Sequence, residues 1–400
     1  MLIGLIGGQH SNLRLTRYTG WIDQSITTLR VDRVIRLGLV IFLVCASLTV
    51  SSKDNPKAQE LIERFQLREG KIPSNQHPKW KAPKNVVFWG GDSQIEPLRK
   101  RFPNLNIVAT NDITQAKTHL KTADVFLGYC IPALLQEKTN VRWIQSMGVG
   151  IEGCANSQSL KASKALVTNT QRLSSPEIAE HSIAMMFALV RQLDLYGKSQ
   201  AKSEWDRSIA PDPNEIWEIE GRTMLVVGLG GIGTETARRA HGLGMKVIAT
   251  RNSRRSGPDY VSYVGLSNEL LDLAKQADVI VNTAPLTEKT MGMYDKAFFE
   301  AMKPNAYFIS IGRGKSVVTE DLLAALKAGQ LAGAGLDVTD PEPLPKDHAL
   351  WTTPRVIITP HVAYRSEKLR PRVMVLVEEN LRRYINGEKM LSVVDLERGY

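Results

Sequence analysis

A glycine-rich turn between an apolar run and a helical segment constrains the fold of this chain most. The sequence TMLVVGLGGIGTETARRA places Gly228, Gly230 and Gly233 directly after an expected strand and at the start of an expected helix. The first glycine permits the tight turn, the second lets backbone N–H groups approach a pyrophosphate, and the third allows close helix–strand packing. This context predicts a dinucleotide-binding site on the turn, with Gly231 and Ile232 included.

The carboxyl-terminal half continues the strand–helix pattern. Six apolar runs are separated by helical stretches, and they read TMLVVG, MKVIAT, DVIVNT, AYFISI, LAGAGLDV and RVIITP. Six strands with intervening helices are what a doubly wound dinucleotide-binding sheet requires. We therefore expect a Rossmann-type domain with a parallel sheet over residues 191–361.

An earlier series of βα units predicts a second domain. The apolar runs NVVFWG, LNIVAT, DVFLGY, VRWIQS and ALVTNT alternate with polar or helix-forming segments from residue 85 onward. The segment PEIAEHSIAMMFALVRQLDLY then predicts one long helix that bridges two domains. A helix from about residue 366 to 385 has no local sheet to join, so we expect it to pack on the first domain. The prediction is a two-domain α/β protein, with residues 84–190 and 362–400 in the first domain.

The amino-terminal 83 residues form an extension in this scheme. Residues 37–52 are uncharged and apolar, and they follow Arg30, Arg33 and Arg36, a pattern typical of a secretory signal. A short buried element and a membrane anchor are the alternatives, so membrane contact through this segment stays open. Export conflicts with the use of a diffusible nicotinamide cofactor, which favours the cytoplasm, so the compartment is not assigned. Residues 53–84 then resemble a tether or a peripheral cap.

The positive charge is concentrated in the same extension. The chain has a net charge of +10, but residues 1–83 hold 12 Lys and Arg against 6 Asp and Glu, a net of +6. Only +4 is left for the other 317 residues, too little for a surface that follows a phosphate backbone. Nucleic acid is therefore not an expected partner.

The three cysteines are interpreted as packing residues. Cys45, Cys130 and Cys154 show neither the pairing of a disulfide framework nor the CxxC spacing of a zinc site. No metal site is expected.

Basic residues follow the second strand of the dinucleotide-binding series. An NAD-specific domain usually carries an acidic residue there for the ribose hydroxyls. This chain instead has the sequence Arg251, Asn252, Ser253, Arg254, Arg255. Guanidinium groups suit a 2′-phosphate, so we expect NADP as the cofactor, with NAD as the alternative.

Charged residues also follow three later strands. Arg313 lies in ISIGRG, Asp337 and Glu342 lie in GLDVTDPEPLP, and His361 lies in ITPHVA. Each segment ends at the carboxyl edge of the expected sheet, which faces a bound dinucleotide. We therefore expect these side chains to converge.

These segments together resemble the D-isomer-specific 2-hydroxyacid dehydrogenases, close to the glyoxylate/hydroxypyruvate reductases. The resemblance covers about residue 85 to the carboxyl terminus. The motifs GLGGIG, NTAPLT, IGRG, GLDVTDPEP and PHVA occur in the family's order, and VRWIQSMGVGIEG resembles its substrate loop. The resemblance implies a flavodoxin-like substrate domain beside the Rossmann domain, and a homodimer.

The resemblance also implies roles for individual residues. Arg313, Glu342 and His361 would be catalytic: Arg313 and the N–H groups of Val149 and Gly150 bind the substrate carboxylate, and His361 exchanges a proton with the C2 oxygen. Glu342 would favour the charged form of the imidazole. Asp337 would hold the nicotinamide carboxamide, or cap a loop. The other expected cofactor contacts are Ala284, Pro285, Ile311, Gly312, Arg313 and His361.

The expected activity is reduction of a small 2-oxo acid to the D-2-hydroxy acid with NAD(P)H. A catalytically silent, corepressor-like protein that senses nicotinamide is the alternative. Thr339, where the family often has an aromatic residue, and the Tyr364-Arg365 pair depart from the family pattern, so the substrate side chain is not specified.

Overall fold

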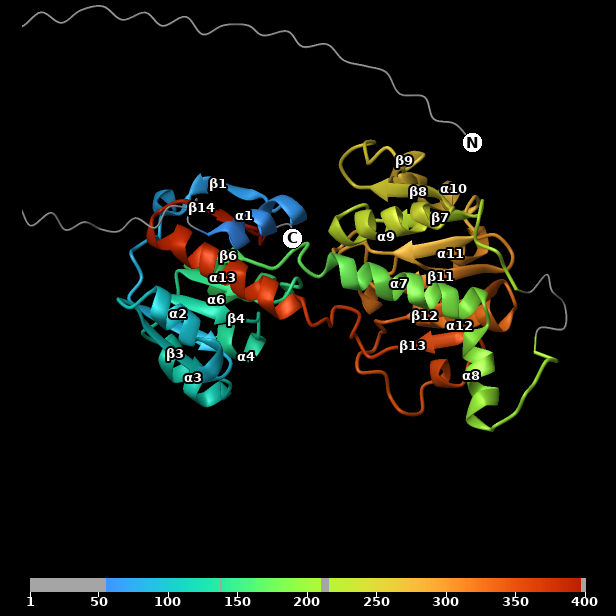
Figure 1. Ribbon diagram of the computed structural model, residues 1–400, viewed down its shortest axis with the longest axis horizontal. Helices are drawn as coiled ribbons and strands as arrows, with labels where there is room; N and C mark the ends of the chain where they lie inside the picture. The colour runs from blue at the N-terminus through green and yellow to red at the C-terminus, as the bar shows by residue number, and fades with distance from the viewer. Residues whose placement is uncertain (1–54, 137–138, 210–215, 397–400) are drawn as a thin grey trace, which may run out of the picture. The chain divides into compact units, whose positions relative to one another are not determined.

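The computed structural model describes residues 55–136, 139–209 and 216–396 (Figure 1). The expected signal-like segment at residues 37–52 and Cys45 lie outside these residues. Among the helices that the structure describes, none is both long and apolar enough to span a bilayer.

The first sheet has five parallel strands in the order β3-β2-β4-β5-β6. They are β2 (Asn85–Trp89), β3 (Asn106–Thr110), β4 (Val125–Gly128), β5 (Trp143–Ser146) and β6 (Leu166–Thr168). The connecting helices are α2 (Glu96–Arg101), α3 (Ile113–Leu120), α4 (Pro132–Leu135), α5 (Glu152–Ala155) and α6 (Gln158–Ser163). All five expected strands are present, and their order is that of a flavodoxin-like sheet.

Segments from both ends of the chain complete this first lobe. Helix α1 (Pro56–Phe65) contacts helix α13 (Leu369–Ile385), and strand β1 (Glu69–Pro73) pairs antiparallel with strand β14 (Lys389–Leu391), as Figure 1 shows. Leu61 and Phe65 are buried in one cluster with α13 residues such as Leu376. Of the two interpretations of residues 53–84, a tether or a peripheral cap, the structure supports the cap where it describes the segment, because apolar residues there are buried and the backbone joins a sheet. The segment is a packed cap.

The second sheet has seven parallel strands in the order β13-β12-β11-β10-β7-β8-β9. They are β7 (Thr223–Val227), β8 (Lys246–Arg251), β9 (Tyr263–Leu266), β10 (Val279–Asn282), β11 (Ala306–Ser310), β12 (Leu331–Leu336) and β13 (Val356–Ile358). Its principal helices are α9 (Gly231–Gly242), α10 (Leu270–Ala274), α11 (Lys296–Ala301) and α12 (Thr319–Lys327). This is the Rossmann-type sheet expected from the six apolar runs.

Strand β9 was not among those six runs. It lies at the edge of the sheet and pairs only with β8. Its sequence YVGL is four residues long, includes a glycine and exposes Tyr263, so it carries little of the apolar pattern that marks a strand.

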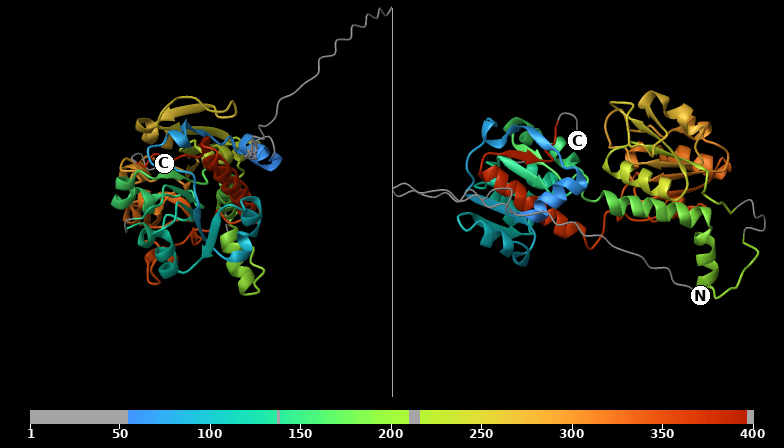
Figure 2. Two further views of the ribbon diagram at one scale, coloured as in Figure 1. Left: turned by 90° about the vertical axis from the view of Figure 1, so that its left-hand side faces the viewer. Right: turned by 45° about the horizontal axis from the view of Figure 1, so that its top comes forward.

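The single long helix expected after residue 175 is instead two helices. Helix α7 (Ser175–Val190) ends before Gln192, whose φ of 55° is left-handed, and helix α8 (Leu193–Ala201) takes another direction (Figure 2). Arg355 explains the break, because it donates to the carbonyl of Leu189 and forms an ion pair with Asp194. Helix α7 packs on α9, β11 and β12. The domain boundaries expected at residues 84, 191 and 362 stay a prediction.

Candidate active site

The glycine turn after β7 has the geometry that a dinucleotide pyrophosphate requires. Gly228 has a φ of 98°, and a Cβ placed on it would lie 2.9 Å from the Cα of Ala284. A Cβ on Gly233 would lie 2.2 Å from the carbonyl oxygen of Gly228. At Gly230 a Cβ would meet nothing within 4 Å, so open space lies at the start of α9. These residues fit a pyrophosphate held by helix N-terminal N–H groups.

The loops after β10 and β11 are held together by Asn282. Its Nδ2 donates to Ser310 Oγ at 3.1 Å and to Ser316 Oγ at 2.9 Å, and its Oδ1 accepts from the N–H of Ala284 at 3.1 Å. A Cβ on Gly312 would lie 2.8 Å from the carbonyl oxygen of Ala284. The expected cofactor contacts at residues 284–285 and 311–313 therefore lie on adjoining loops at one edge of the sheet.

The basic segment after β8 is only partly available for a ligand. Arg251 is half-buried, and its Nε donates to the carbonyl of Leu229 in the glycine turn at 3.0 Å. Asn252, Ser253 and Arg254 are exposed. Arg255 is different, because it forms an ion pair with Glu269 at 2.7 Å and a hydrogen bond with Tyr263. The guanidinium of Arg255 is thus engaged within the β8–β9 region and is not part of the site.

His361 and Glu342 meet at the carboxyl edge of the same sheet. The Nδ1 of His361 lies 2.7 Å from Oε1 of Glu342, and both side chains are about two-fifths exposed. Because a carboxylate only accepts, Nδ1 carries the proton in this contact. The Nε2 atom is then left to face a ligand.

Asp337 organises the loop that carries His361. Its Oδ1 accepts from Thr359 Oγ1 at 2.6 Å and from the N–H of Val362 at 2.9 Å, and its Oδ2 accepts from the N–H of Ala363 at 3.1 Å. Asp337 is 3% exposed. This is the loop-capping arrangement named as the second role of Asp337, and contact with a nicotinamide stays a prediction.

His181 belongs to the same hydrogen-bonded group. Its Nε2 lies 2.9 Å from Thr359 Oγ1 and 3.8 Å from Asp337 Oδ1. The histidine on α7 therefore supports the loop of His361 and lies behind it.

Arg313 lies beside the expected substrate loop. A Cβ placed on Gly150 would lie 2.5 Å from Arg313 Nη2, and the N–H groups of Val149 and Gly150 donate to no acceptor among the described residues. Asn169 Nδ2 donates to the carbonyl of Val149 at 2.9 Å and fixes the loop. The guanidinium and two N–H groups thus occupy the place expected for a carboxylate.

Glu152 is a residue that the sequence analysis missed. Its Oε1 accepts from Arg313 Nε at 2.7 Å. Burial raises the pKa of the Glu152 carboxyl, but the charge and hydrogen bond of Arg313, a backbone N–H and the charge of His361 together lower it by more, so that this pKa lies below its ordinary value. A carboxylate within the expected substrate-loop segment was the available signal, and a short-range motif does not reveal that it contacts Arg313.

A cavity of about 740 Å³ joins these groups. Its walls include Val149, Gly150, Ile232, Ile311, Arg313, Asp337 and His361. Tyr129 and Tyr364 also line it, and burial raises the pKa of Tyr129. Residues from both sheets therefore surround one space that opens on the histidine and the arginine.

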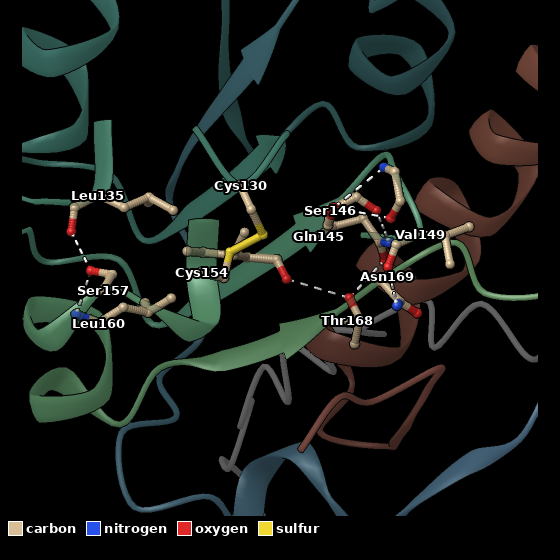
Figure 3. Close-up of a disulfide and its surroundings, with 12 residues drawn as sticks. Cys130, Leu135, Gln145, Ser146, Val149, Cys154, Ser157, Leu160, Thr168 and Asn169 are labelled. Atoms are coloured by element: carbon tan, nitrogen blue, oxygen red, sulfur yellow. Dashed lines mark hydrogen bonds between the residues drawn. A yellow bond between two sulfur atoms is a disulfide. The ribbon is translucent and has the colours of Figure 1, made fainter. Parts of the chain in front are cut away.

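The interpretation of all three cysteines as packing residues is wrong for two of them. Cys130 and Cys154 form a disulfide that joins the loop after β4 to helix α5, next to the loop of Val149 (Figure 3). The chain brings their Cα atoms within 5.0 Å across 24 residues of sequence. Sequence spacing alone does not report this approach, because it depends on the fold of the loop.

Comparison with known proteins identifies the family. The profile of the D-isomer specific 2-hydroxyacid dehydrogenase NAD binding domain matches residues 183–363. Glyoxylate/hydroxypyruvate reductase B of Klebsiella pneumoniae (strain 342) is 32% identical over 260 residues, which cover 64% of this chain and 78% of that protein. Glyoxylate reductase of Pyrococcus furiosus is 34% identical over 240 residues, or 58% of this chain and 69% of that protein.

Solved structures agree with these sequence relatives. A D-isomer specific 2-hydroxyacid dehydrogenase family protein from Aeromonas salmonicida has 28% identity and a TM-score of 0.69, over 79% of this chain and 100% of that one. The NADPH-dependent glyoxylate/hydroxypyruvate reductase of Sinorhizobium meliloti, solved with NADP and sulfate, has 26% identity and a TM-score of 0.66 over 79% of this chain and 100% of that one. The chain therefore belongs to the D-isomer-specific 2-hydroxyacid dehydrogenases, a family of nicotinamide-dependent oxidoreductases.

Proposed function

We propose that this protein reduces a small 2-oxo acid of the glyoxylate or hydroxypyruvate type to the D-2-hydroxy acid with NADPH. The observation that carries the proposal is the Glu342–His361 pair at 2.7 Å, in a protein whose Arg313 and His361 line one cavity. The named relatives that are glyoxylate or glyoxylate/hydroxypyruvate reductases support the substrate class.

Arg313 binds the substrate and polarises it. A guanidinium is always charged and presents N–H groups to oxygen pairs, so Arg313 holds the carboxylate and draws electron density from the C2 carbonyl. The free N–H groups of Val149 and Gly150 hold the other side of the carboxylate. This grip fixes which face of the C2 carbon is turned toward the glycine turn and its cofactor.

His361 supplies the proton. A bound reduced nicotinamide supplies the hydride that C2 accepts. The imidazolium of His361 donates its Nε2 proton to the C2 oxygen, and the neutral imidazole takes that proton back in the oxidative direction. Glu342 accepts from Nδ1 and keeps a proton on that atom, so that Nε2 is the atom that exchanges its proton with the C2 oxygen in both directions.

NADP is the proposed cofactor because the end of β8 bears no carboxylate. Arg251 is fixed over the glycine turn through Leu229, and Arg254 is exposed beside it. Guanidinium groups at this place match a 2′-phosphate in charge and in hydrogen-bonding geometry. NADP in the complex from Sinorhizobium meliloti supports the assignment.

The deciding experiment compares NADPH and NADH oxidation with glyoxylate, hydroxypyruvate, pyruvate and bulkier 2-oxo acids. We expect turnover with the small acids, a preference for NADPH, and loss of the rate in Arg313→Ala and His361→Ala. The proposal fails if no 2-oxo acid is reduced, or if both variants keep the wild-type rate. Tight NADPH binding without turnover, together with a specific protein partner, supports the nicotinamide-sensing alternative instead.

The proposed compartment is an oxidising one outside the cytoplasm, where the proposed reaction requires a supply of NADPH. The Cys130–Cys154 disulfide supports it, because such bonds persist in secreted proteins and are rare in the cytosol. The apolar segment at residues 37–52 has the pattern of a secretory signal, with a membrane anchor and a short buried element as the alternatives. Fractionation with amino-terminal sequencing of the mature chain tests the placement. A reduced protein in the cytosol with residues 37–52 still attached contradicts it.

The proposed assembly is a homodimer. Trp205 is 94% exposed and Leu193 is 56% exposed, so both side chains are accessible to a second copy of the chain. Sedimentation of the wild type and of Trp205→Ser measures the assembly. A wild-type protein that sediments as a monomer at micromolar concentration contradicts it.

A further inference from the structure

Four arginines lie close enough to one another near the glycine turn for their charges to interact, and two of them come from outside the seven-stranded sheet. Arg251 and Arg254 follow β8. Arg172 follows β6, and Arg68 immediately precedes β1 in the amino-terminal cap. We call these four the arginine cluster.

Arg172 contacts the start of helix α9. A Cβ placed on Gly231 would lie 2.8 Å from Arg172 Cγ and 3.4 Å from its Cα, so only a glycine leaves room for this side chain. Arg172 has a φ of 74°, a left-handed conformation that is uncommon outside glycine. Its Nη1 lies 3.4 Å from the carbonyl of Phe65 and from Gln66 Oε1, at the end of α1. The side chain therefore runs from the pyrophosphate turn toward the amino-terminal cap.

A buried hydroxyl at the same place has no partner. Ser175 is 3% exposed, and its Oγ makes no hydrogen bond among the described residues. This oxygen lies 2.7 Å from the position of a Cβ on Gly231. Burying a hydroxyl without a partner costs free energy, so this group points to an acceptor that a ligand supplies.

The charges of the cluster are also uncompensated. No carboxylate among the described residues pairs with any of the four guanidinium groups, whereas the nearby Arg255 has Glu269. Burial lowers the pKa of Arg251, and the positive charges of Arg254, Arg172 and Arg68 lower it further. Burial and the charge of Arg68 likewise lower the pKa of Arg172. Cations held together without an anion repel one another, and a ligand with several negative charges relieves that repulsion.

We propose that Arg172 and Arg68 are part of the cofactor site, with Arg172 on the pyrophosphate and Arg68 acting with Arg254 on the 2′-phosphate. The proposal rests on the proposed NADP-dependent function and assigns phosphate recognition to residues outside the Rossmann sheet. The cap over residues 55–83 then has a ligand-binding role. In this proposal NADP contacts both lobes at its pyrophosphate and 2′-phosphate groups. It also contacts both lobes at its nicotinamide end.

Two substitutions separate the two assignments, with titration calorimetry of NADPH and NADH as the readout. Arg172→Ala removes a charged contact to a group that both cofactors share, so we expect Kd to rise about tenfold for each. Arg68→Ala acts on a group that only NADPH carries, so we expect Kd to rise about tenfold for NADPH and less than about twofold for NADH. Arg172→Lys keeps the charge and is expected to recover part of the affinity.

One matched variant and the unfolding temperatures serve as controls. Arg64→Ala removes an exposed arginine of α1, four residues before Arg68, and is expected to leave both affinities within about twofold. Wild-type unfolding temperatures in all variants exclude misfolding, and Arg172→Lys serves if Arg172→Ala does not fold. The inference is overturned if Arg172→Ala and Arg68→Ala bind NADPH and NADH with the same Kd as the wild type. Wild-type NADPH binding without turnover of any 2-oxo acid overturns the proposed reaction only, so the two failures are distinct.

Discussion

The two parallel sheets are built alike at their amino-terminal edges. In each, an Ala-Asp pair precedes a buried strand, with Asp124 before β4 and Asp278 before β10. Asp124 Oδ2 accepts from the N–H groups of Lys84 and Asn85 at 2.8 and 3.0 Å, where β2 begins. Asp278 Oδ2 accepts from the N–H of Thr223 at 2.7 Å, where β7 begins. The same carboxylate therefore ties two neighbouring strands together in both sheets.

The carboxyl-terminal edges differ. Strand β7 leads through the glycine turn into the 12-residue helix α9, whereas β2 leads through a 3-10 turn into the six-residue helix α2. The loop after β10 is held by the hydrogen bonds of Asn282, and the loop after β4 is held by the Cys130–Cys154 disulfide. One edge of each sheet therefore serves stability, while the other differs between the sheets and carries the loops that bind ligands and do chemistry.

The largest effect is expected at the catalytic edge of the seven-stranded sheet. His361→Asn removes the proton donor and is expected to lower kcat by about 10²- to 10⁴-fold, because general acid–base catalysis contributes that much. The unfolding temperature should not change, since His361 is two-fifths exposed. Steady-state kinetics and thermal unfolding measure both. The control is His119→Asn on α3, and a stable His361→Asn enzyme with the wild-type kcat contradicts the assignment.

Removing the disulfide tests whether it stabilises the loop after β4, as the hydrogen bonds of Asn282 stabilise the loop after β10. Replacing both Cys130 and Cys154 by Ala frees a loop of about 24 residues and is expected to lower the free energy of unfolding by about 3 kcal/mol. Urea unfolding measures the loss, and hydrogen exchange should place it in the five-stranded lobe. Cys45→Ser is the control for thiol effects. Equal loss of protection in both lobes would show that the bond stabilises more than its own loop.

The aspartates test the similarity of the amino-terminal edges. Asp124→Asn and Asp278→Asn each lose a charged acceptor for backbone N–H groups, so both should lower the free energy of unfolding by about 2 kcal/mol. Neither lies near the cavity, so NADPH affinity should stay unchanged. Titration calorimetry beside urea unfolding checks this. A loss of stability in only one variant would show that the two aspartates do not stabilise their sheets in the same way.

Acid unfolding tests the contribution of Asp124 through its pH dependence. Burial raises the pKa of Asp124, but the N–H groups of Asn85 and Lys84 and the charge and hydrogen bond of Arg142 together lower it by more, so the net shift is downward. A lowered carboxyl pKa adds stability above its ordinary value, and this stability is lost as pH falls through the lowered value. The wild type should therefore lose stability more steeply than Asp124→Asn below about pH 4. Parallel curves would contradict the origin of the shift.

The smallest effect concerns Glu152, which competes with the substrate for Arg313. Glu152→Gln removes a negative charge beside the place of the substrate carboxylate, so KM for glyoxylate should fall by about threefold to tenfold, with kcat within about twofold. Kinetics at two salt concentrations measures it. Exposed Glu300→Gln is the control. A higher KM would show that Glu152 positions Arg313 and does not compete with the substrate.

Much of the fold could be predicted from the sequence, because both sheets consist of apolar runs with turn residues between them. The strands of the five-stranded sheet and the glycine turn follow directly from that local pattern. Strand β9 and the break at Gln192 could not be predicted, since one has almost no apolar pattern and the other depends on a distant Arg355. An element that depends on contacts with residues far away in the sequence leaves no pattern in its own residues.

The candidate site divides in the same way. Arg313, Glu342 and His361 lie in motifs with a known order, so they could be named in advance. Glu152, Arg172 and the Cys130–Cys154 pair act through contacts between loops that are far apart in sequence or belong to different sheets. Only the folded chain shows which of these loops approach each other.

The first lobe is assembled from both ends of the chain, and this affects how the protein emerges from the ribosome. The Rossmann sheet is one continuous stretch, so it has all its strands as soon as β13 has been synthesised. The lobe that starts first must wait for α13 and β14, because α1 and β1 are buried against them. The cap that carries Arg68 is therefore translated before both sheets and, among the described segments, is one of the last to reach its final place. A ribosome-bound chain that stops before residue 369 would expose this cap to proteases while its second lobe is already protected.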